Sequence, residues 1–271
     1  MARCGCSNPE ALEGLCNCAL TAAPGSLVSV AGTGQPGDPY VIGLTATPSI
    51  GFIGQQRFTT VGADFFDPSV FPGARWFHVT CVGGGGGGCG AYGASSARGG
   101  GSGANMAQSW LLAASVVGSQ AITVGAGGVG GPGNASNDPG DPGGPSIFGS
   151  AVVLAGGGNG AGADNPAGTG VLIENGAPPS SVGIGDLVVL GEYGGSGFQV
   201  ATGAGQGGKG GNAAGGWGFG SPGGIASGGS GQTGRIGTRY GAGGSGAASV
   251  STVGQQGGNG SGGIIIVDAW G

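Results

Sequence analysis

Six consecutive glycines occupy residues 83–88 and directly follow the strand-like stretch 75–82, which is rich in aromatic residues. Glycine loses more conformational freedom on folding than any other residue. A chain with 76 glycines among 271 residues therefore either holds them in a regular, mutually stabilising backbone arrangement or stays unfolded. Which of these two states is adopted determines what the protein can do.

The composition argues against disorder. Disordered chains are poor in apolar residues and rich in net charge, whereas this chain is 38% hydrophobic, only 7% charged, and has a mean hydropathy of +0.19. Collagen requires glycine at every third position over long stretches, and here that register holds only in short runs. Gly228, Gly231, Gly234 and Gly237 hold it for four repeats, as do Gly254, Gly257, Gly260 and Gly263.

Short runs with a period of three suit polyglycine II, an extended helix with three residues per turn and no internal hydrogen bonds. The N–H and C=O groups of such a helix point outward and need partners when they are buried. Several helices must therefore pack side by side, and glycine allows their backbones to approach closely. We favour this packed arrangement over loose glycine loops.

The remainder of the chain predicts short β-strands between the glycine runs. In 75–82, Phe77, Val79 and Cys81 alternate with Trp76, His78 and Thr80, which is the period-two pattern of a strand. Residues 106–117 suit a helix, although the turn at 118–119 favours a hairpin with 120–124 instead. Further strands are expected at 115–117, 147–154, 171–174, 186–190 and 264–267.

The first 54 residues differ from the rest, because they contain far fewer glycines and two Cys-x-Cys pairs. Strands are expected at 26–31 and 40–42, around a Pro/Gly turn. We therefore predict a segment 1–54 that attaches or trimerises the protein, and a glycine-rich β domain 55–271. The sequence shows no signal peptide and no apolar run of membrane-spanning length, which predicts synthesis in a cytoplasm and no membrane insertion.

The N-terminal cysteines are the candidates for metal chemistry. Cys4, Cys6, Cys16 and Cys18 form C-x-C-x9-C-x-C, whereas structural zinc sites usually space each pair by two to four residues. We favour disulfides, and a structural zinc site or free thiols remain the alternatives. Cys81 and Cys89 flank the glycine run and are predicted to be buried free thiols, because cysteine behaves as a small hydrophobe.

Signals of catalysis and nucleic-acid binding are missing. The chain has one histidine, seven Lys or Arg residues and twelve scattered acids, so no nucleophile and base can be paired. Lys209 lies among glycines, but neither serine nor threonine follows it as in a phosphate-binding loop. His78 is predicted to pack beside an aromatic ring or at a subunit contact. A net charge of −5 disfavours nucleic acid, and we predict neither an enzyme nor a cofactor.

Several motifs follow one another in a distinctive order over about 55–271. They are Phe58-Thr59-Thr60, Phe71-Pro72-Gly73, His78-Val79-Thr80-Cys81-Val82 before the glycine run, Ile122-Thr123-Val124-Gly125, Gly143-Gly144-Pro145-Ser146-Ile147-Phe148-Gly149 and Gly262-Gly263-Ile264-Ile265-Ile266-Val267. This order resembles that of the glycine-rich tail-fibre or minor tail proteins of tailed bacteriophages. The stretch Val28-Ser29-Val30-Ala31-Gly32-Thr33-Gly34, followed by Asp38-Pro39-Tyr40-Val41-Ile42, is similar to segments that precede such domains in phages of actinobacteria. One departure is Asp64-Phe65-Phe66-Asp67, which replaces the usual Gly-Thr-aromatic hairpin and puts the first strand pair in doubt.

The resemblance implies an all-β, trimeric fibre or tail-tip protein located in the virion, which contacts other tail-tip or baseplate proteins and a host-surface glycan. Because aromatic rings stack on sugars and loops carry binding, the receptor-binding candidates are Trp217, Phe219, Arg235, Arg239 and Tyr240. The alternative that Trp217 and Phe219 pack as core residues stays open. A glycine-rich bacterial surface protein and an antifreeze-type polyglycine protein are the other function classes.

Overall fold

The computed structural model describes residues 28–31, 41–44, 51–134, 138–162, 172–201, 204–227 and 230–271. The chain divides into two compact units, Met1–Gly51 and Phe52–Gly271. In the first unit, β1 (Val28–Ala31) and β2 (Val41–Leu44) pair antiparallel. Both strands overlap the segments that the sequence predicts to be extended, whereas Cys4, Cys6, Cys16 and Cys18 lie outside the described residues.

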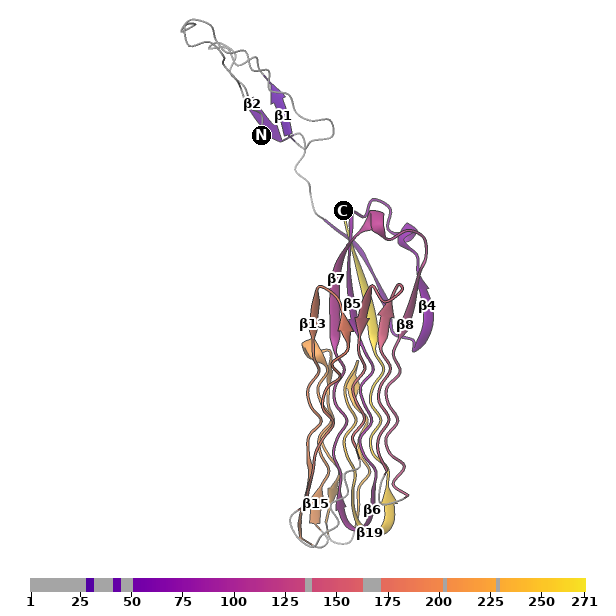
Figure 1. The fold of residues 1–271 in the computed structure, drawn as a ribbon, viewed down its shortest axis with the longest axis vertical. Coiled ribbons are helices and arrows are strands. Elements are labelled where there is room, and N and C mark those ends of the chain that lie inside the picture. The colour runs from indigo at the N-terminus through magenta and orange to yellow at the C-terminus, as the bar shows by residue number, and fades with distance from the viewer. Residues whose placement is uncertain are drawn as a thin grey trace, which may run out of the picture. The chain divides into compact units, whose positions relative to one another are not determined.

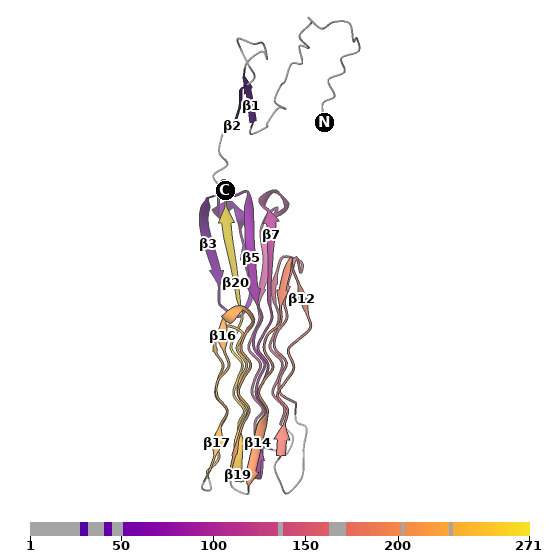
Figure 2. The same ribbon diagram turned by 90° about the vertical axis from the view of Figure 1, so that its left-hand side faces the viewer.

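One end of the second unit is a sandwich of two five-stranded antiparallel sheets (Figures 1 and 2). The first sheet has the order β13-β7-β5-β20-β3, with β3 (Phe52–Phe58), β5 (Trp76–Val82), β7 (Met106–Leu112), β13 (Leu187–Val189) and β20 (Ile264–Trp270). The second has the order β12-β10-β9-β8-β4, with β4 (Gly62–Phe66), β8 (Gln120–Val124), β9 (Ser146–Phe148), β10 (Val153–Ala155) and β12 (Gly183–Ile184).

The core of the sandwich follows from the period-two pattern that the sequence shows. Phe77, Val79 and Cys81 of β5 point inward and are buried against the second sheet. Phe66 lies at the centre, with its ring centroid 5.3 Å from that of Phe77 and 5.6 Å from that of Phe148. The two strands around the doubted hairpin, β3 and β4, both form. They belong to different sheets and do not pair with each other.

Beyond the sandwich, the chain runs repeatedly along a bundle of extended glycine-rich segments (Figures 1 and 2). In segment 83–90, successive N–H groups donate to three different neighbours in turn. Gly86 donates to Ser102 O at 3.0 Å, Gly87 to Asp141 O at 2.9 Å and Gly88 to Gly258 O at 2.8 Å. The carbonyls accept from three further segments with the same period of three, which is the hydrogen-bonding pattern of polyglycine II.

Two other segments, 98–105 and 241–247, are likewise surrounded by six hydrogen-bonded neighbours. These three inner segments contact one another, and every residue in them is buried. The outer segments form a closed ring around them, in which each bonds to the next. In order around the ring they are 125–133, 138–145, 156–162, 175–182, 190–196, 207–213, 218–224, 231–237 and 256–263. The three inner segments and the ring of outer segments together form a small hexagonal lattice.

Glycine is required where these segments touch. A Cβ atom on Gly84 would fall on the carbonyl oxygen of Ala126, and one on Gly87 would fall on that of Val129. Asn105 is a polar side chain buried in an inner segment, and it is tolerated because it is fully bonded. Its amide donates to Ser180 O and Val182 O at 2.9 and 2.8 Å, and its Oδ1 accepts from Gly191 N at 3.0 Å.

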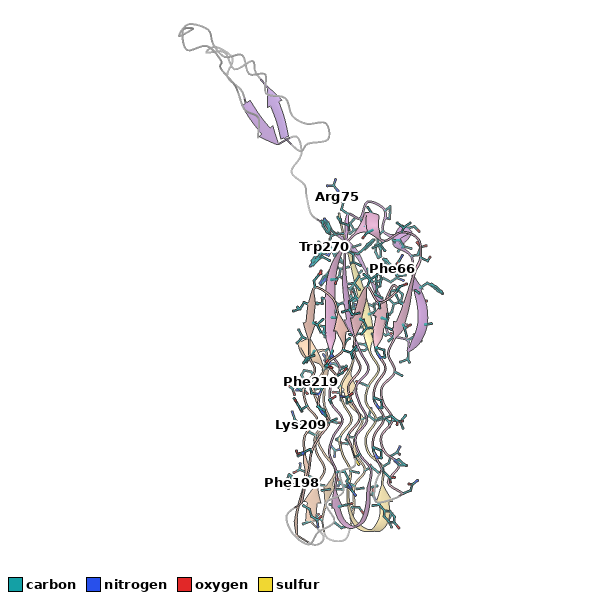
Figure 3. All side chains as sticks on the ribbon, in the orientation of Figure 1. Phe66, Arg75, Phe198, Lys209, Phe219 and Trp270 are labelled. Carbon is teal, nitrogen blue, oxygen red and sulfur yellow. The ribbon has the colours of Figure 1, made fainter. Side chains whose placement is uncertain are left out.

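The far end of the bundle carries short strands and turns (Figures 1 and 2). Here β6 pairs with β19, and a second sheet has the order β11-β14-β15-β17. The bounds are β6 (Ala91–Ala97), β11 (Leu172–Glu174), β14 (Gly197–Ala201), β15 (Ala204–Gln206), β17 (Ile225–Ala226) and β19 (Ala248–Gln255). Figure 3 places Phe198 near this end and Trp270 at the sandwich end.

The structure confirms an all-β fold with a packed glycine-rich region, and no α-helix occurs in the part of the chain described. Three local predictions were wrong. Residues 106–117 begin as β7, but β7 and β8 lie in different sheets and form no hairpin. Residues 115–117 are not a strand, because the one-turn 3-10 helix η2 (Ala113–Ser115) carries the chain between the sheets. The segment 147–154 is broken into β9 and β10 by a turn with positive φ at Gly149 and Ala151.

The close approach of the segments generates a stability prediction with a matched control. Gly87→Ala places a methyl group against Val129 O, whereas a Cβ on Gly162 meets nothing within 4 Å. We expect Gly87→Ala to lower the free energy of unfolding by ~3 kcal/mol or more, and Gly162→Ala to change it by less than about 1 kcal/mol. Denaturant unfolding measures both. Equal effects would show that the bundle is looser than described.

The hydrogen-bond network generates a second prediction. Amides bonded inside a cooperative unit exchange only when that unit opens, so the amides of 83–90, 98–105 and 241–247 should exchange far more slowly than those of the exposed turn at 59–61. Hydrogen exchange followed by mass spectrometry on the full chain tests this. Exchange of the inner segments within seconds would contradict the packed arrangement.

Candidate functional site

The outer face of the sheet β13-β7-β5-β20-β3 carries a cluster of rings, which we call the aromatic face. Phe52, Trp76 and Trp110 are exposed, and His78 and Trp270 are partly buried. The strand register brings these residues together, because Trp270 is opposite both Trp76 and Phe52, and His78 is opposite Trp110. The alternation that sends Phe77 and Val79 into the core sends Trp76 and His78 outward. Phe52 is 56% exposed and Trp110 is 50% exposed.

The rings of the aromatic face contact one another. The centroid of Trp270 lies 5.4 Å from that of Phe52, edge to face, and 6.0 Å from that of Trp110. The imidazole of His78 stacks on Trp110 at 4.6 Å with an interplanar angle of 28°. This contact confirms the prediction that His78 packs beside an aromatic ring. The spacing of about 5–6 Å is the range in which aromatic pairs attract beyond their buried area.

A row of polar side chains runs beside the rings on the same sheet. Asp268 Oδ2 lies 3.6 Å from His78 Nδ1, and Asp268 Oδ1 accepts a hydrogen bond from Gln55 Nε2 at 2.6 Å. The side chains of His78 and Asp268 are each about one-fifth exposed, so water still screens the pair. The aromatic face thus lies beside a row of hydrogen-bonded polar side chains.

The half of this outer face nearest the bundle is covered by the bundle itself. Val82, Met106 and Ile264 form a buried cluster, and Trp217 and Tyr240 pack against it. Trp217 Nε1 lies 3.3 Å from Met106 Sδ. Two of the five receptor-binding candidates are therefore partly buried at the junction of sandwich and bundle, and their contacts here are those of core residues.

Two other candidates are exposed at the same junction. Strands β16 (Gly218–Phe219) and β18 (Thr238–Arg239) pair antiparallel, with Phe219 opposite Thr238. Phe219 is 52% exposed, and Arg239 is exposed and adopts φ of 62°. Figure 3 shows Phe219 just beyond the sandwich, with Lys209 further along the bundle.

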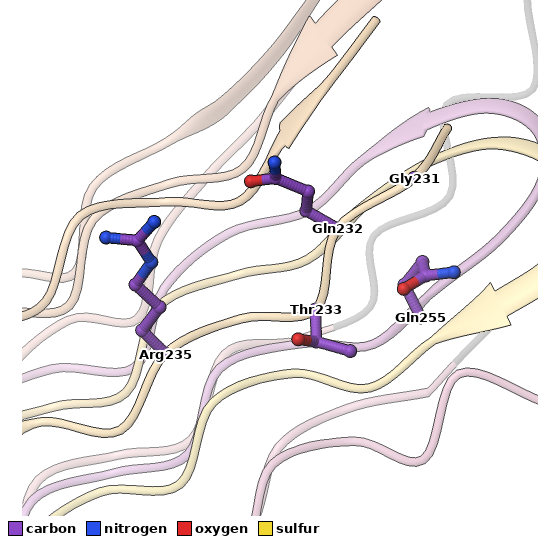
Figure 4. Close-up of a pocket in the computed structure, with 5 residues that line it drawn as sticks. All are labelled: Gly231, Gln232, Thr233, Arg235 and Gln255. Atoms are coloured by element: carbon purple, nitrogen blue, oxygen red, sulfur yellow. The ribbon is translucent and has the colours of Figure 1, made fainter. Parts of the chain in front are cut away.

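The fifth candidate, Arg235, lies apart from the others in a surface groove on the flank of the bundle (Figure 4). A depression of about 360 Å³ is lined by Gly231, Gln232, Thr233, Arg235 and Gln255. A second depression of about 210 Å³ adjoins it at Thr233 and continues along Ile236, Gln256 and Asn259. We call the two together the flank groove.

The described cysteines are structural. Cys81 and Cys89 are both buried, as predicted, and burial raises the pKa of the Cys81 thiol far above its ordinary value. Cys89 Sγ lies 3.0 Å from the carbonyl oxygen of Asp138. No group of three or more His, Cys, Asp or Glu side chains able to hold a metal occurs in the described segments. The disulfide, zinc and free-thiol alternatives for Cys4, Cys6, Cys16 and Cys18 concern residues outside them.

These features define a class of protein: an all-β sandwich extended by a hydrogen-bonded polyglycine bundle. The chain belongs to the glycine-rich domain family, whose model matches residues 60–270. A comparison with curated proteins found no match. Among the described residues, no helix is both long and apolar enough to cross a membrane.

Sequence reasoning did not find the aromatic face. Trp76, Trp110 and Trp270 are far apart in the chain, and only the pairing of β5, β7 and β20 makes them neighbours. The available signal was the alternation in 75–82, which leaves large rings on both faces of one strand. Of the residues that line the flank groove, the sequence pointed only to Arg235.

The aromatic face generates a prediction about association. Contiguous exposed apolar surface on a protein usually marks an interface, so we expect the full chain to self-associate and light scattering to give a mass above the 25.0 kDa of one chain. Trp110→Ser should raise the dissociation constant about tenfold or more. Phe219→Ala removes a ring of similar exposure elsewhere and should have little effect. A folded monomer at micromolar concentration would contradict the expectation.

Proposed function

We propose that this chain is a structural virion protein of a bacteriophage tail, a minor tail protein or tail fibre, that contributes to recognition and adsorption to the host-cell surface. The observation that carries the proposal is the layout of the second unit. The unit begins at Phe52 and ends at Gly271, both at the sandwich end, while strands β6, β14 and β19 lie at the opposite end of the bundle (Figures 1 and 2).

Such a layout suits a protein that is anchored at one end and presents loops at the other. The bundle between the two ends has its inner backbone groups bonded to neighbouring segments, which makes it a rigid spacer. Rigid scaffolds with loops at one end are a common arrangement for binding proteins. The order of motifs over about 55–271, which resembles that of phage tail proteins, supports the same proposal.

The proposal includes the partners. A homotrimer is the first expectation for a tail-tip component, and the aromatic face is the surface that it or another tail-tip or baseplate protein would cover. The target on the host is a cell-surface glycan. The charge of −5 spread over 271 residues provides little long-range steering, so a neutral glycan is expected. We assign no catalytic role and no cofactor.

Electron microscopy of virions labelled with an antibody against residues 55–271 tests the location. We expect label at the tail. Because assembly could bury the epitopes, partly dissociated tails are labelled as well. Tails that stay unlabelled in both states would contradict the proposal.

Adsorption of phage to cells tests the receptor role of the junction residues. Phe219→Ala and Arg239→Gln change exposed side chains and should reduce adsorption about tenfold through lost contacts, amplified by multivalency, while particles still assemble. Trp217→Ala and Tyr240→Ala are less informative, because both residues also pack against the buried cluster. Adsorption should depend little on salt, and a collapse at high salt would exclude a neutral target.

A further inference from the structure

The flank groove lies where the outer segments 231–237 and 256–263 run side by side, and its form is fixed by backbone hydrogen bonds. Gly234 N donates to Gln256 O at 2.8 Å, and Gly237 N donates to Asn259 O at 3.0 Å. Gln232 N donates to Ala248 O at 2.8 Å, and Arg235 N donates to Ser245 Oγ at 2.8 Å. The groove is therefore preorganised, so a ligand would lose little affinity to ordering of the protein backbone.

The side chains that line the groove have unused hydrogen-bonding capacity. Within the described residues, the side chains of Thr233, Arg235, Gln255 and Gln256 form no hydrogen bond or ion pair. Gln232 Oε1 accepts from Ile225 N at 3.1 Å, which holds the side chain but leaves its amide N–H groups as donors. Asn259 is held in the same way, because its Oδ1 accepts from Gly130 N at 2.8 Å.

The floor of the groove is glycine backbone, and one apolar side chain is set among the polar ones. Gly231 and Gly234 belong to one side and Gly257 and Gly258 to the other. Ile236 is 62% exposed and provides apolar surface beside the amides. Side-chain amides and a hydroxyl can hydrogen-bond the hydroxyl groups of a sugar, and an aliphatic side chain can contact the apolar face of its ring. The groove therefore has the chemistry that recognises a sugar.

The shape and charge of the groove narrow the ligand further. The two depressions adjoin along the bundle axis, where one turn of a polyglycine helix advances about 9 Å, so the groove matches a linear chain and not a compact ligand. Its charged lining is limited to Arg235, and the net charge of −5 opposes a polyanion. We propose that the flank groove binds a neutral, linear glycan lengthwise, which rests on the proposed function and adds a glycan contact on the flank of the bundle to the one proposed at the junction.

The test uses the full chain and saturation-transfer NMR, which detects weak binding. The probes are maltohexaose, laminarihexaose and N-acetylchitohexaose as neutral linear glycans, with hexagalacturonate as the acidic comparison. Thr233 is exposed and lies where the two depressions meet, so Thr233→Trp fills the groove without disturbing the bundle. Thr233→Ser keeps the hydroxyl, and Ser196→Trp adds the same bulk at an exposed position of another outer segment.

We expect at least one neutral hexasaccharide to bind, Thr233→Trp to weaken that binding about tenfold or more, and both control variants to retain it. Absence of binding to all three neutral probes, undiminished binding to Thr233→Trp, or tighter binding of hexagalacturonate would each overturn the proposal. If antibody labels virion tails but no glycan binds in the groove, the proposed function stands and the groove proposal fails. If a glycan binds in the groove but tails carry no label, the groove binds glycan and the proposed tail function fails.

Discussion

The whole second unit depends on how closely extended backbones can approach when no Cβ atom lies between them. Each inner segment satisfies its N–H and C=O groups on six neighbours, and this is possible only where glycine occupies the contacts. The entropy lost by ordering glycine is offset by bonds shared among many segments. The bundle is therefore cooperative, because no segment keeps its bonding partners alone.

The sandwich and the bundle solve the problem of a stable interior in different ways. The sandwich buries Phe66, Phe77 and Phe148 between two sheets, whereas the inner segments of the bundle are mostly glycine and bury few side chains. The two are continuous, because β5 leads directly into 83–90 and 256–263 leads directly into β20. The pairing of strands in the sandwich fixes where the glycine-rich segments begin relative to one another, and the bundle continues that alignment away from the sandwich.

The sequence was sufficient for the kind of fold but not for its arrangement. Period-three glycine runs predicted the packed region, and alternation in 75–82 predicted β5. Nothing local marks 98–105 as an inner segment, since it contains Arg98, Ser102 and Asn105, and Asn105 is accommodated by partners distant in sequence. Four of the five receptor-binding candidates lie together at the junction, and Arg235 lies apart from them. The aromatic face required the register of four strands, which no single stretch of sequence encodes.

The high glycine content of the inner bundle also affects its response to temperature. The heat-capacity change of unfolding rises with exposed apolar area and falls with exposed polar area. Unfolding the inner segments exposes mainly peptide groups, so their contribution to this change is small for the number of residues involved. The stability curve of the bundle is correspondingly flat, so its free energy of unfolding varies less between cold and warm surroundings than that of a conventional hydrophobic core.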